Sequence, residues 1–399
     1  MNPRLQTLQA YPFERLRALI AGVVPNAAKR AINLSIGEPR HPTPQLVLDA
    51  LAAGAVTGLA NYPTTQGAPT LREAIAGWLA RRHGLAALAA ASQVLPVLGS
   101  REALFAVAQT IVDASRPGAT VVVPNPFYQI YEGAALLAGA DPYCVNADPA
   151  AAFAHDWSAV PDAVWARTQL LYVCSPDNPT GKVLDLAGWR VLFALSDRHG
   201  FVIASDECYS EVFFDEAKPP LGALAAAQAL GRTDFPRLLV FGSLSKRSNA
   251  PGLRSGYVAG DAALIKAFLL YRTYHGSAMS AAVAAASVAA WNDEAHVRAN
   301  RALYAAKFAA LQPRLAAALP CTMPDAAFYL WAATPIDDAE FARRLLAEEN
   351  VMVLPGEFLA RNAHGAHPGR GRIRIALVAS PEECAEAIGR IVAFAGRLY

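Results

Sequence analysis

The segment best suited to chemistry is Ser243-Leu-Ser-Lys246, which is followed eight residues later by Arg254. Two hydroxyls and an arginine can together hold a phosphate group. A lysine in such a site can form a Schiff base when burial destabilises its ammonium. The segment therefore predicts a place where a phosphate anchors a ligand beside a reactive amine. An exposed Ser-Lys turn is the alternative that this segment alone leaves open.

Two further polar segments follow apolar runs of the chain. In Asp206-Glu-Cys-Tyr209, a carboxylate at the end of a strand can pair with a protonated ring nitrogen, and the tyrosine can donate to a phenolic oxygen. In Ser175-Pro-Asp-Asn178-Pro-Thr-Gly181, the prolines and the glycine make a rigid loop that presents one amide side chain. A helix N-cap at Asp206 and an ordinary Asn-Pro turn are the alternatives.

A parallel β-sheet would position these segments. Short apolar runs, each followed by a turn and a helical pattern, occur at Gln93–Leu98, Ala119–Val123, Gln169–Val173, Phe201–Ser205 and Leu238–Phe241. Runs that are apolar throughout are typical of strands covered on both faces, and the helical stretches between them are long enough for crossovers. The pattern predicts an α/β doubly wound fold, in which ligands bind beyond the carboxyl ends of the strands.

The character of the chain changes after Met279. A long Ala-rich helical region runs to Ala310, and strand-like pieces follow at Ala327–Ala332, Val351–Leu354 and Arg372–Leu377. This change predicts a smaller α+β domain. We expect a large domain over residues 46–284 and a small domain formed by residues 1–45 together with residues 285–399.

Composition excludes several other classes of protein. The chain has 399 residues, a net charge of +2 and only 17% charged residues, so it carries no basic footprint for nucleic acid. No apolar run approaches the roughly 18 residues of a membrane span. Five scattered cysteines without Cys-x-x-Cys or metal-ligand spacing favour a reducing cytoplasm and no metal site. The 54% hydrophobic content must be buried in a thick core or in a subunit interface.

The order and spacing of Asn178, Asp206, Tyr209, Lys246 and Arg254 resemble the class I/II aminotransferases, which are pyridoxal-phosphate (PLP) enzymes of fold type I. The resemblance implies PLP as cofactor and a mostly parallel seven-stranded sheet in a large domain, with a smaller α+β domain beside it. It covers essentially the whole chain, and the further motifs that carry it are Ile36-Gly-Glu-Pro39, Asn61-Tyr62-Pro63 with Gly67 and Leu71-Arg72, Gly99-Ser-Arg-Glu-Ala-Leu104, Pro126-Phe-Tyr128 and Arg372-Ile-Arg-Ile-Ala376.

The resemblance also implies the catalytic roles. Lys246 would form an aldimine with PLP and, once a substrate amino group displaces it, would act as the general base of a ping-pong transamination. Asp206 would keep the pyridine nitrogen protonated, which makes the ring an electron sink. Asn178 and Tyr209 would hold the phenolic oxygen of the cofactor.

The phosphate of the cofactor would lie where a helix begins. The resemblance implies that the backbone N–H groups of Ser100 and Arg101 bind it there, and that Ser243, Ser245 and Arg254 complete the phosphate site.

Two aromatic residues complete the implied cofactor site. Tyr128 would stack on the PLP ring. Tyr62 would reach the phosphate of the neighbouring subunit. The resemblance thus implies a homodimer with shared active sites, which acts on small amino-acid and keto-acid substrates.

The substrate site is implied in part. Arg374 would bind the substrate α-carboxylate through two parallel hydrogen bonds beside Asn178, and Gly37 would let that carboxylate approach the backbone. Within the family, the chain most resembles bacterial N-succinyldiaminopimelate aminotransferases, in Tyr11–Leu16 and Tyr271–Met279 among other segments. The implied reaction exchanges an amino group between glutamate/2-oxoglutarate and N-succinyl-LL-2,6-diaminopimelate, in lysine biosynthesis.

A long substrate with a distal carboxylate needs a second cation. Arg272 and Arg40 are the candidates, and a structural arginine at an interface is the alternative. An aspartate- or acetylornithine-type aminotransferase is the alternative function, followed by a PLP-dependent C–S β-lyase, which shares the fold and the lysine. Tyr128, where aspartate aminotransferases have Trp, weakens the case for aspartate. His41 and His275 are left without a role.

Overall fold

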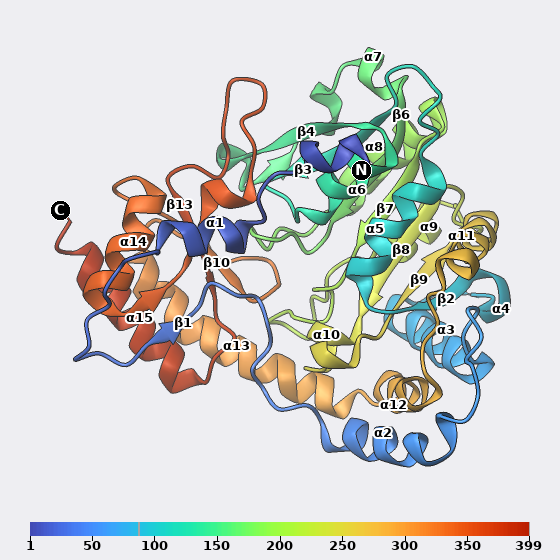
Figure 1. Ribbon diagram of the computed structural model, residues 1–399, viewed down its shortest axis with the longest axis horizontal. Coiled ribbons are helices and arrows are strands. Elements are labelled where there is room, and N and C mark those ends of the chain that lie inside the picture. The colour runs from blue at the N-terminus through green and yellow to red at the C-terminus, as the bar shows by residue number, and fades with distance from the viewer. Residues whose placement is uncertain (87, 399) are drawn as a thin grey trace.

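The structure is a computed structural model that describes residues 1–86 and 88–398. Its main element is a mixed central sheet (Figure 1). The strand order is β2 (Val94–Val97), β9 (Gly256–Gly260), β8 (Leu238–Ser243), β7 (Val202–Asp206), β6 (Thr168–Cys174), β3 (Thr120–Asn125), β4 (Asp141–Asp148) and the two-residue β5 (Ala154–His155). Strand β9 runs antiparallel to both of its neighbours, whereas the strands from β8 to β4 in this order are parallel.

The predicted mostly parallel sheet is confirmed. Each of the five apolar runs forms a strand, and the described residues place seven strands plus the short β5 in the sheet. The sequence did not indicate β4 or β9. Most β4 side chains are exposed or half-buried, and β9 has a glycine at each end, which leaves only three residues between them. Neither strand therefore shows the long apolar run that marks a buried parallel strand.

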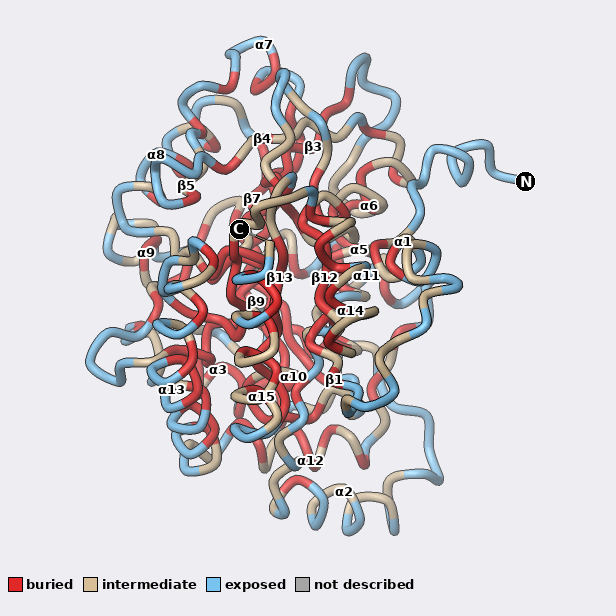
Figure 2. The backbone as a smooth tube through the Cα atoms, turned by 90° about the vertical axis from the view of Figure 1, so that its left-hand side faces the viewer, coloured by how far each residue is buried: buried red, intermediate tan, exposed pale blue. Residues whose placement is uncertain are grey.

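Helices cover both faces of the sheet. Alternate strand residues supply the two layers, so that Leu171 and Val173 face one set of helices, whereas Leu170 and Tyr172 face the other. The buried backbone in Figure 2 follows these strands through the centre of the molecule. The first set of helices comprises α3 (Pro69–His83), α8 (Leu186–His199), α9 (Ala223–Ala229) and α12 (Ala281–Asn292), and the second comprises α5 (Ser100–Ile111), α6 (Ile130–Ala138) and α11 (Ala262–His275).

The carboxyl ends of the central strands bring the predicted segments together. Asp206, at the end of β7, lies beside Cys174 on β6 and Phe241 on β8. The chain leaves β6 into the loop that holds Asn178, and it leaves β8 into the one-turn helix α10 (Leu244–Arg247). Three segments that are far apart in sequence thus meet at one edge of the sheet, as ligand sites in doubly wound folds do.

The C-terminal part has its own core. Its sheet has the order β10 (Tyr329–Ala333), β13 (Arg372–Ala376) and β12 (Leu354–Pro355), and the helices packed with it are α13 (Ala295–Ala316), α14 (Asp338–Glu349) and α15 (Pro381–Ala395). The single Ala-rich helical region expected after Met279 is two helices, α12 and α13. Between them, the Asp293 carboxylate accepts a hydrogen bond from the His296 N–H at 3.0 Å, which satisfies a free donor in the first turn of α13.

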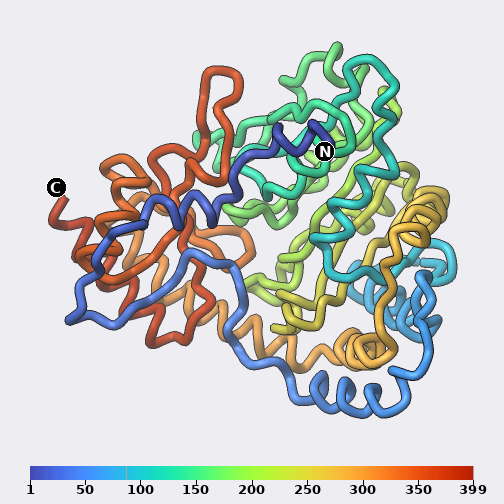
Figure 3. Tube along the Cα trace, in the orientation of Figure 1, coloured from blue at the N-terminus to red at the C-terminus, as the bar shows by residue number. Residues whose placement is uncertain are grey.

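The N-terminal segment joins this C-terminal part. Strand β1 (Ile32–Asn33) pairs in parallel with β11 (Val351–Met352), and Figure 3 shows the blue N-terminal trace running along the orange and red C-terminal trace. Helix α12, by contrast, packs on α2 (Gln45–Gly58) and α3. The expected division at residues 45/46 and 284/285 stays a prediction. No helix in the described ranges is long and apolar enough to cross a bilayer.

The remaining elements are short. They are the helices α1 (Pro12–Leu19), α4 (Ala90–Gln93) and α7 (Asp162–Trp165), and the 3₁₀ turns η1 (Pro3–Thr7), η2 (Pro149–Ala151), η3 (Trp157–Ala159), η4 (Pro251–Leu253) and η5 (Gly356–Leu359).

Candidate active site

A cavity of about 560 Å³ lies at the carboxyl edge of the central sheet. Residues of the sheet, of the N-terminal segment and of β13 all contribute to its wall. The predicted site residues that line it are Gly37, Ser100, Arg101, Tyr128, Asn178, Asp206, Tyr209, Ser243, Ser245, Lys246, Arg254 and Arg374. Further lining residues that the sequence did not single out include Tyr11, Glu38, Gln129, Cys208 and Tyr329.

The Lys246 amine projects into this cavity from α10. Its Nζ donates to the Gly37 carbonyl oxygen at 2.5 Å and lies 5.4 Å from the centre of the Phe328 ring. Burial lowers the pKa of Lys246 to about 8, because the charged form loses its hydration. A substantial neutral fraction near neutral pH is what an amine needs to attack a carbonyl carbon.

Asp206 lies in the wall of the cavity and has its own hydrogen-bond donors. Its Oδ2 accepts from the Tyr131 hydroxyl at 2.7 Å, and its Oδ1 accepts from the Cys208 N–H at 3.2 Å. Burial raises the pKa of this carboxyl, while the two donors partly oppose the rise. A positively charged partner in the cavity would stabilise the ionised form further.

Sequence reasoning missed Tyr131. It lies on α6, is fully buried, and stacks on Tyr172 of β6 with 4.7 Å between ring centres and 12° between ring planes. The Tyr172 hydroxyl donates in turn to the Leu104 carbonyl oxygen at 2.6 Å. No local pattern indicated Tyr131, because its contact with Asp206 depends on how α6 packs against the sheet.

The start of α5 forms a cradle for an anion. Gly99 caps this helix with a φ of +84°, and a Cβ at that position would lie 2.5 Å from Arg254 Nη2. A glycine there lets the guanidinium approach the free N–H groups that begin at Ser100. Opposite them, the Ser243 hydroxyl donates to Ser245 Oγ at 2.9 Å. Hydroxyls, a guanidinium and a helix N-terminus fit a phosphate group.

Arg374 lies at the buried end of the cavity and is only 4% exposed. Its Nη1 donates to Asn178 Oδ1 at 2.9 Å, and its Nη2 donates to the Ser35 carbonyl oxygen at 2.8 Å. Its Nε has no hydrogen-bond partner among the described residues. The contact through Asn178 Oδ1 leaves the amide NH₂ free to donate, and the guanidinium retains a donor for an incoming carboxylate.

The close approach of Tyr329 requires a glycine at position 37. A Cβ there would lie 1.8 Å from the Tyr329 hydroxyl, so any side chain would displace that ring. Tyr329 also shares a 2.8 Å hydrogen bond with the Tyr209 hydroxyl and carries the Arg374 guanidinium 4.4 Å above its ring. The sequence did not reveal that Tyr329 links Tyr209, in the predicted cofactor site, with Arg374, in the predicted carboxylate site.

The Arg101 side chain lies at the exposed part of the cavity. Its Nε donates to the Tyr128 hydroxyl, and its Nη2 donates to the Tyr11 hydroxyl at 3.4 Å. The residue is exposed and pairs with no carboxylate among the described residues. Two tyrosines therefore hold an unneutralised guanidinium beside the cavity.

Three predicted site residues lie elsewhere. Arg272 is 1% exposed and forms an ion pair with Glu102 of α5, because a buried guanidinium needs a carboxylate. Arg40 pairs with Glu383 at 3.2 Å and donates to the Asn33 carbonyl oxygen at 3.1 Å. Neither lines the cavity of its own chain, and the expectation that one of them reads the distal carboxylate stays a prediction. Tyr62 is fully exposed and lies outside its own chain's cavity.

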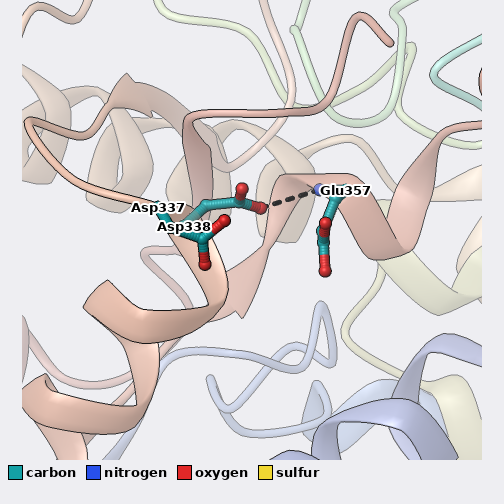
Figure 4. Close-up of side chains that lie close together, drawn as sticks. All are labelled: Asp337, Asp338 and Glu357. Carbon is teal, nitrogen blue, oxygen red and sulfur yellow. Dashed lines mark hydrogen bonds between the residues drawn. The ribbon is translucent and has the colours of Figure 1, made fainter.

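An acidic group in the C-terminal part is explained by backbone contacts. Asp338 accepts from the Glu357 N–H at 2.9 Å and from the Gly371 N–H at 3.0 Å, and Asp337 caps α14 (Figure 4). Glu357 pairs with Arg15 at 3.6 Å. These carboxylates join neighbouring segments of the chain through hydrogen bonds and an ion pair, and they do not line the cavity.

The fold and the site together define a PLP-dependent transferase. The features that define it are the mostly parallel sheet, the lysine on the turn after β8 and the anion cradle at the start of α5. Residues 29–391 match the family model described as aminotransferase class I and II, and the chain belongs to that family. Enzymes of this family depend on pyridoxal 5′-phosphate, whose ring draws electrons from the amino-bearing carbon of the substrate. The buried amine of Lys246, the buried carboxylate of Asp206 and the anion cradle at the start of α5 fit that cofactor.

Known relatives agree with this assignment. A solved aminotransferase structure from Neisseria meningitidis is 51% identical, has a TM-score of 0.95 and covers 99% of this chain and 100% of its own. An LL-diaminopimelate aminotransferase of Gloeobacter violaceus is 32% identical over 91% of this chain and 90% of its own. A probable N-succinyldiaminopimelate aminotransferase of Thermus thermophilus is 27% identical, has a TM-score of 0.83 and covers 96% of this chain and 99% of its own.

Proposed function

We propose that this aminotransferase exchanges an amino group between glutamate/2-oxoglutarate and N-succinyl-LL-2,6-diaminopimelate. Among the described residues, three guanidiniums line the cavity, and Arg254 lies at the phosphate cradle. The observation that carries the proposal is the other two, of which Arg374 is buried and Arg101 is exposed. A substrate with a carboxylate at each end satisfies both. Two relatives support the same substrate class, because one is named for LL-diaminopimelate and another for N-succinyldiaminopimelate.

In this proposal, each residue of the site has a separate role. Arg374 binds the α-carboxylate and Asn178 orients it. Lys246 attaches the cofactor and then moves the proton at the amino-bearing carbon. Asp206 holds the proton on the ring nitrogen, and Tyr209 donates to the phenolic oxygen. An acidic amino acid with a short side chain, such as aspartate, is the alternative occupant of the same two arginine sites.

The Arg101→Leu variant tests the distal site. We expect kcat/KM for N-succinyl-diaminopimelate to fall about tenfold to a hundredfold, because one charge-assisted contact is lost. The kcat/KM for alanine, which has no distal carboxylate, should change by less than about threefold. Steady-state kinetics with both amino donors measures the ratio.

Arg40→Leu is the matched control, since it removes a guanidinium that is already paired outside the cavity. It should leave the ratio of the two kcat/KM values unchanged. An Arg101→Leu variant that loses activity equally for long and short donors would contradict the assignment of Arg101 to the distal carboxylate.

We also propose a homodimer in which Tyr62 enters the partner's cavity. The support is the set of large apolar side chains that are strongly exposed in the single chain, which include Val56, Leu59, Tyr62, Leu270 and Tyr274. Apolar surface of this kind is typical of subunit interfaces. It would also take up part of the 54% hydrophobic content noted in the sequence.

A hybrid dimer tests this arrangement. Lys246→Ala should inactivate its own site, and Tyr62→Ala should lower activity about tenfold to a hundredfold through the lost phosphate contact. A hybrid of one subunit of each type contains one site with both residues intact. Differently tagged subunits, co-expressed and purified as the hybrid, should therefore show about half of the wild-type activity.

The control is each homodimer assayed alone. If Tyr62 serves its own chain, the hybrid holds no intact site and its activity stays below about a tenth of wild type. That result would overturn the shared-site proposal.

A further inference from the structure

Lys307 of α13 is a buried lysine with no carboxylate partner among the described residues. It is 2% exposed, and its Nζ donates to the carbonyl oxygens of Leu377 at 2.6 Å and Ala379 at 2.9 Å. Its third contact is His41 Nε2 at 3.0 Å, and the amine lies 4.5 Å from the centre of the Tyr304 ring. Three donors and three acceptors match, so the ammonium is fully hydrogen-bonded without a counter-charge.

The contact with Lys307 sets the tautomer of His41. Because the lysine donates to Nε2, the imidazole proton lies on Nδ1, which donates to Asn300 Oδ1 at 2.8 Å. The same oxygen accepts from Asn249 Nδ2 at 3.0 Å. Asn300 Nδ2 points to the Lys246 carbonyl oxygen at 3.5 Å. The donors therefore run in one direction from Lys307 to the backbone of the reactive lysine.

This network connects three walls of the cavity. His41 follows Gly37 by four residues, and the Gly37 oxygen contacts the Lys246 amine. The Leu377 and Ala379 carbonyls come directly after β13, the strand that carries Arg374. The Lys307 ammonium thus adds a buried link between the segment of Gly37 and the strand of Arg374, beside the direct hydrogen bond from Arg374 to the Ser35 carbonyl oxygen.

We propose that Lys307 and His41 are positioning residues that set the site of the substrate α-carboxylate. The inference rests on the proposed function, because it assumes that Arg374 and Gly37 receive that carboxylate. Neither residue lines the cavity, so their effect passes through the backbone of β13 and of the N-terminal segment. A small displacement of either backbone segment would weaken substrate binding, since the binding of a carboxylate by a guanidinium depends on geometry.

The energetic cost of this lysine argues against a purely structural role. Burial lowers the pKa of Lys307 to about 8, and the titratable groups near it within residues 1–86 and 88–398 are His41, Tyr304 and the Cys384 thiol of α15. A buried ammonium without a counter-charge opposes folding, and its three hydrogen bonds offset that cost in part. A neutral side chain would avoid the cost of burying a charge, so this ammonium is better explained by the acceptors that it holds in place than by stability.

The Lys307→Met variant of the holoenzyme tests the proposal, with the exposed Lys266→Met of α11 as control. Glutarate, which has the carbon skeleton of glutamate without its amino group, is the probe, and calorimetry measures its binding. We expect about tenfold weaker binding for Lys307→Met, unchanged cofactor affinity and only a small change in the thermal midpoint, because relief of the buried charge offsets the loss of a donor to three acceptors. Lys266→Met should match wild type in all three measurements.

Each other outcome has a definite meaning. Equal glutarate binding by Lys307→Met and wild type overturns the inference, and so does a loss of binding that accompanies a large fall in the thermal midpoint. A wild-type enzyme that binds no glutarate and transfers no amino group from glutamate overturns the proposed function instead.

Variants of His41 give an independent test. Gln can accept from Lys307 through its carbonyl and donate to Asn300 through its amide, whereas Leu can do neither. We expect His41→Gln to bind glutarate within about twofold of wild type, and His41→Leu about tenfold more weakly. Equal binding by the two variants would show that the hydrogen bonds through His41 do not position the site.

Discussion

Replacing Lys246 by alanine is expected to lower kcat/KM for amino-group transfer from glutamate by about four to six orders of magnitude. The residue supplies both the covalent attachment of the cofactor and the base at the amino-bearing carbon, and no other lysine lines the cavity within the described ranges. The visible absorbance band of the lysine–cofactor linkage should vanish with it. Rapid-mixing spectroscopy with glutamate measures both effects in one experiment.

The same lysine gives a pH dependence with a definite sign. Because burial lowers the pKa of Lys246 to about 8, half of the amine is neutral near pH 8 and nearly all of it is neutral above about pH 9. The rate at which the apoprotein attaches added PLP should therefore rise with a midpoint near pH 8, rather than near 10.5, and level off above about pH 9. Lys266→Ala, an exposed replacement on α11, should leave rate and absorbance unchanged. An active Lys246→Ala enzyme would exclude the proposed mechanism.

The sequence identified the groups that project from the ends of the parallel strands. Asn178, Asp206 and Lys246 each follow an apolar run, and all three line one cavity because the carboxyl ends of parallel strands meet at one edge. Arg374 was found only through the family resemblance. It comes from a strand of the C-terminal part, and no local pattern says which strand will face the central sheet.

Groups that support these residues could not be found in the same way. The contact between Tyr131 and Asp206 depends on how α6 is set against the sheet, which no local pattern encodes. Lys307 and His41 are 266 residues apart, and their contact requires the N-terminal segment to return to the C-terminal part. No sequence feature distinguishes a helical lysine that is buried among three hydrogen-bond acceptors from one that is exposed to solvent.

Arginine residues illustrate the same limit. The role of Arg272 as a reader of a distal carboxylate stays a prediction, and the sequence did not indicate that Glu102 of α5 pairs with it in the core. Arg101 was expected to act only through its backbone N–H, yet its side chain carries the unneutralised charge at the cavity. Whether a guanidinium is free depends on which carboxylates surround it in space, and the sequence does not specify that.

Asp206→Asn is expected to lower kcat/KM about a thousandfold or more while leaving the fold of the apoprotein intact. The change keeps the size of the side chain but removes the charge that would hold a proton on the ring nitrogen. In the apoprotein, burial raises the pKa of Asp206, so the folded state holds its proton to higher pH than the unfolded chain. Stability is then lost as pH rises through that window, and the neutral Asn side chain avoids the loss.

Apoprotein unfolding at pH 7 should therefore show Asp206→Asn to be at least as stable as wild type, although its activity is nearly abolished. Tyr131→Phe is the matched variant, because it removes the 2.7 Å donor and keeps the carboxylate. One hydrogen bond to a charged group corresponds to a loss of about tenfold to a hundredfold. If Asp206→Asn lost no more activity than Tyr131→Phe, the negative charge would not matter, and Asp206 would act only as a hydrogen-bond acceptor in the wall of the cavity.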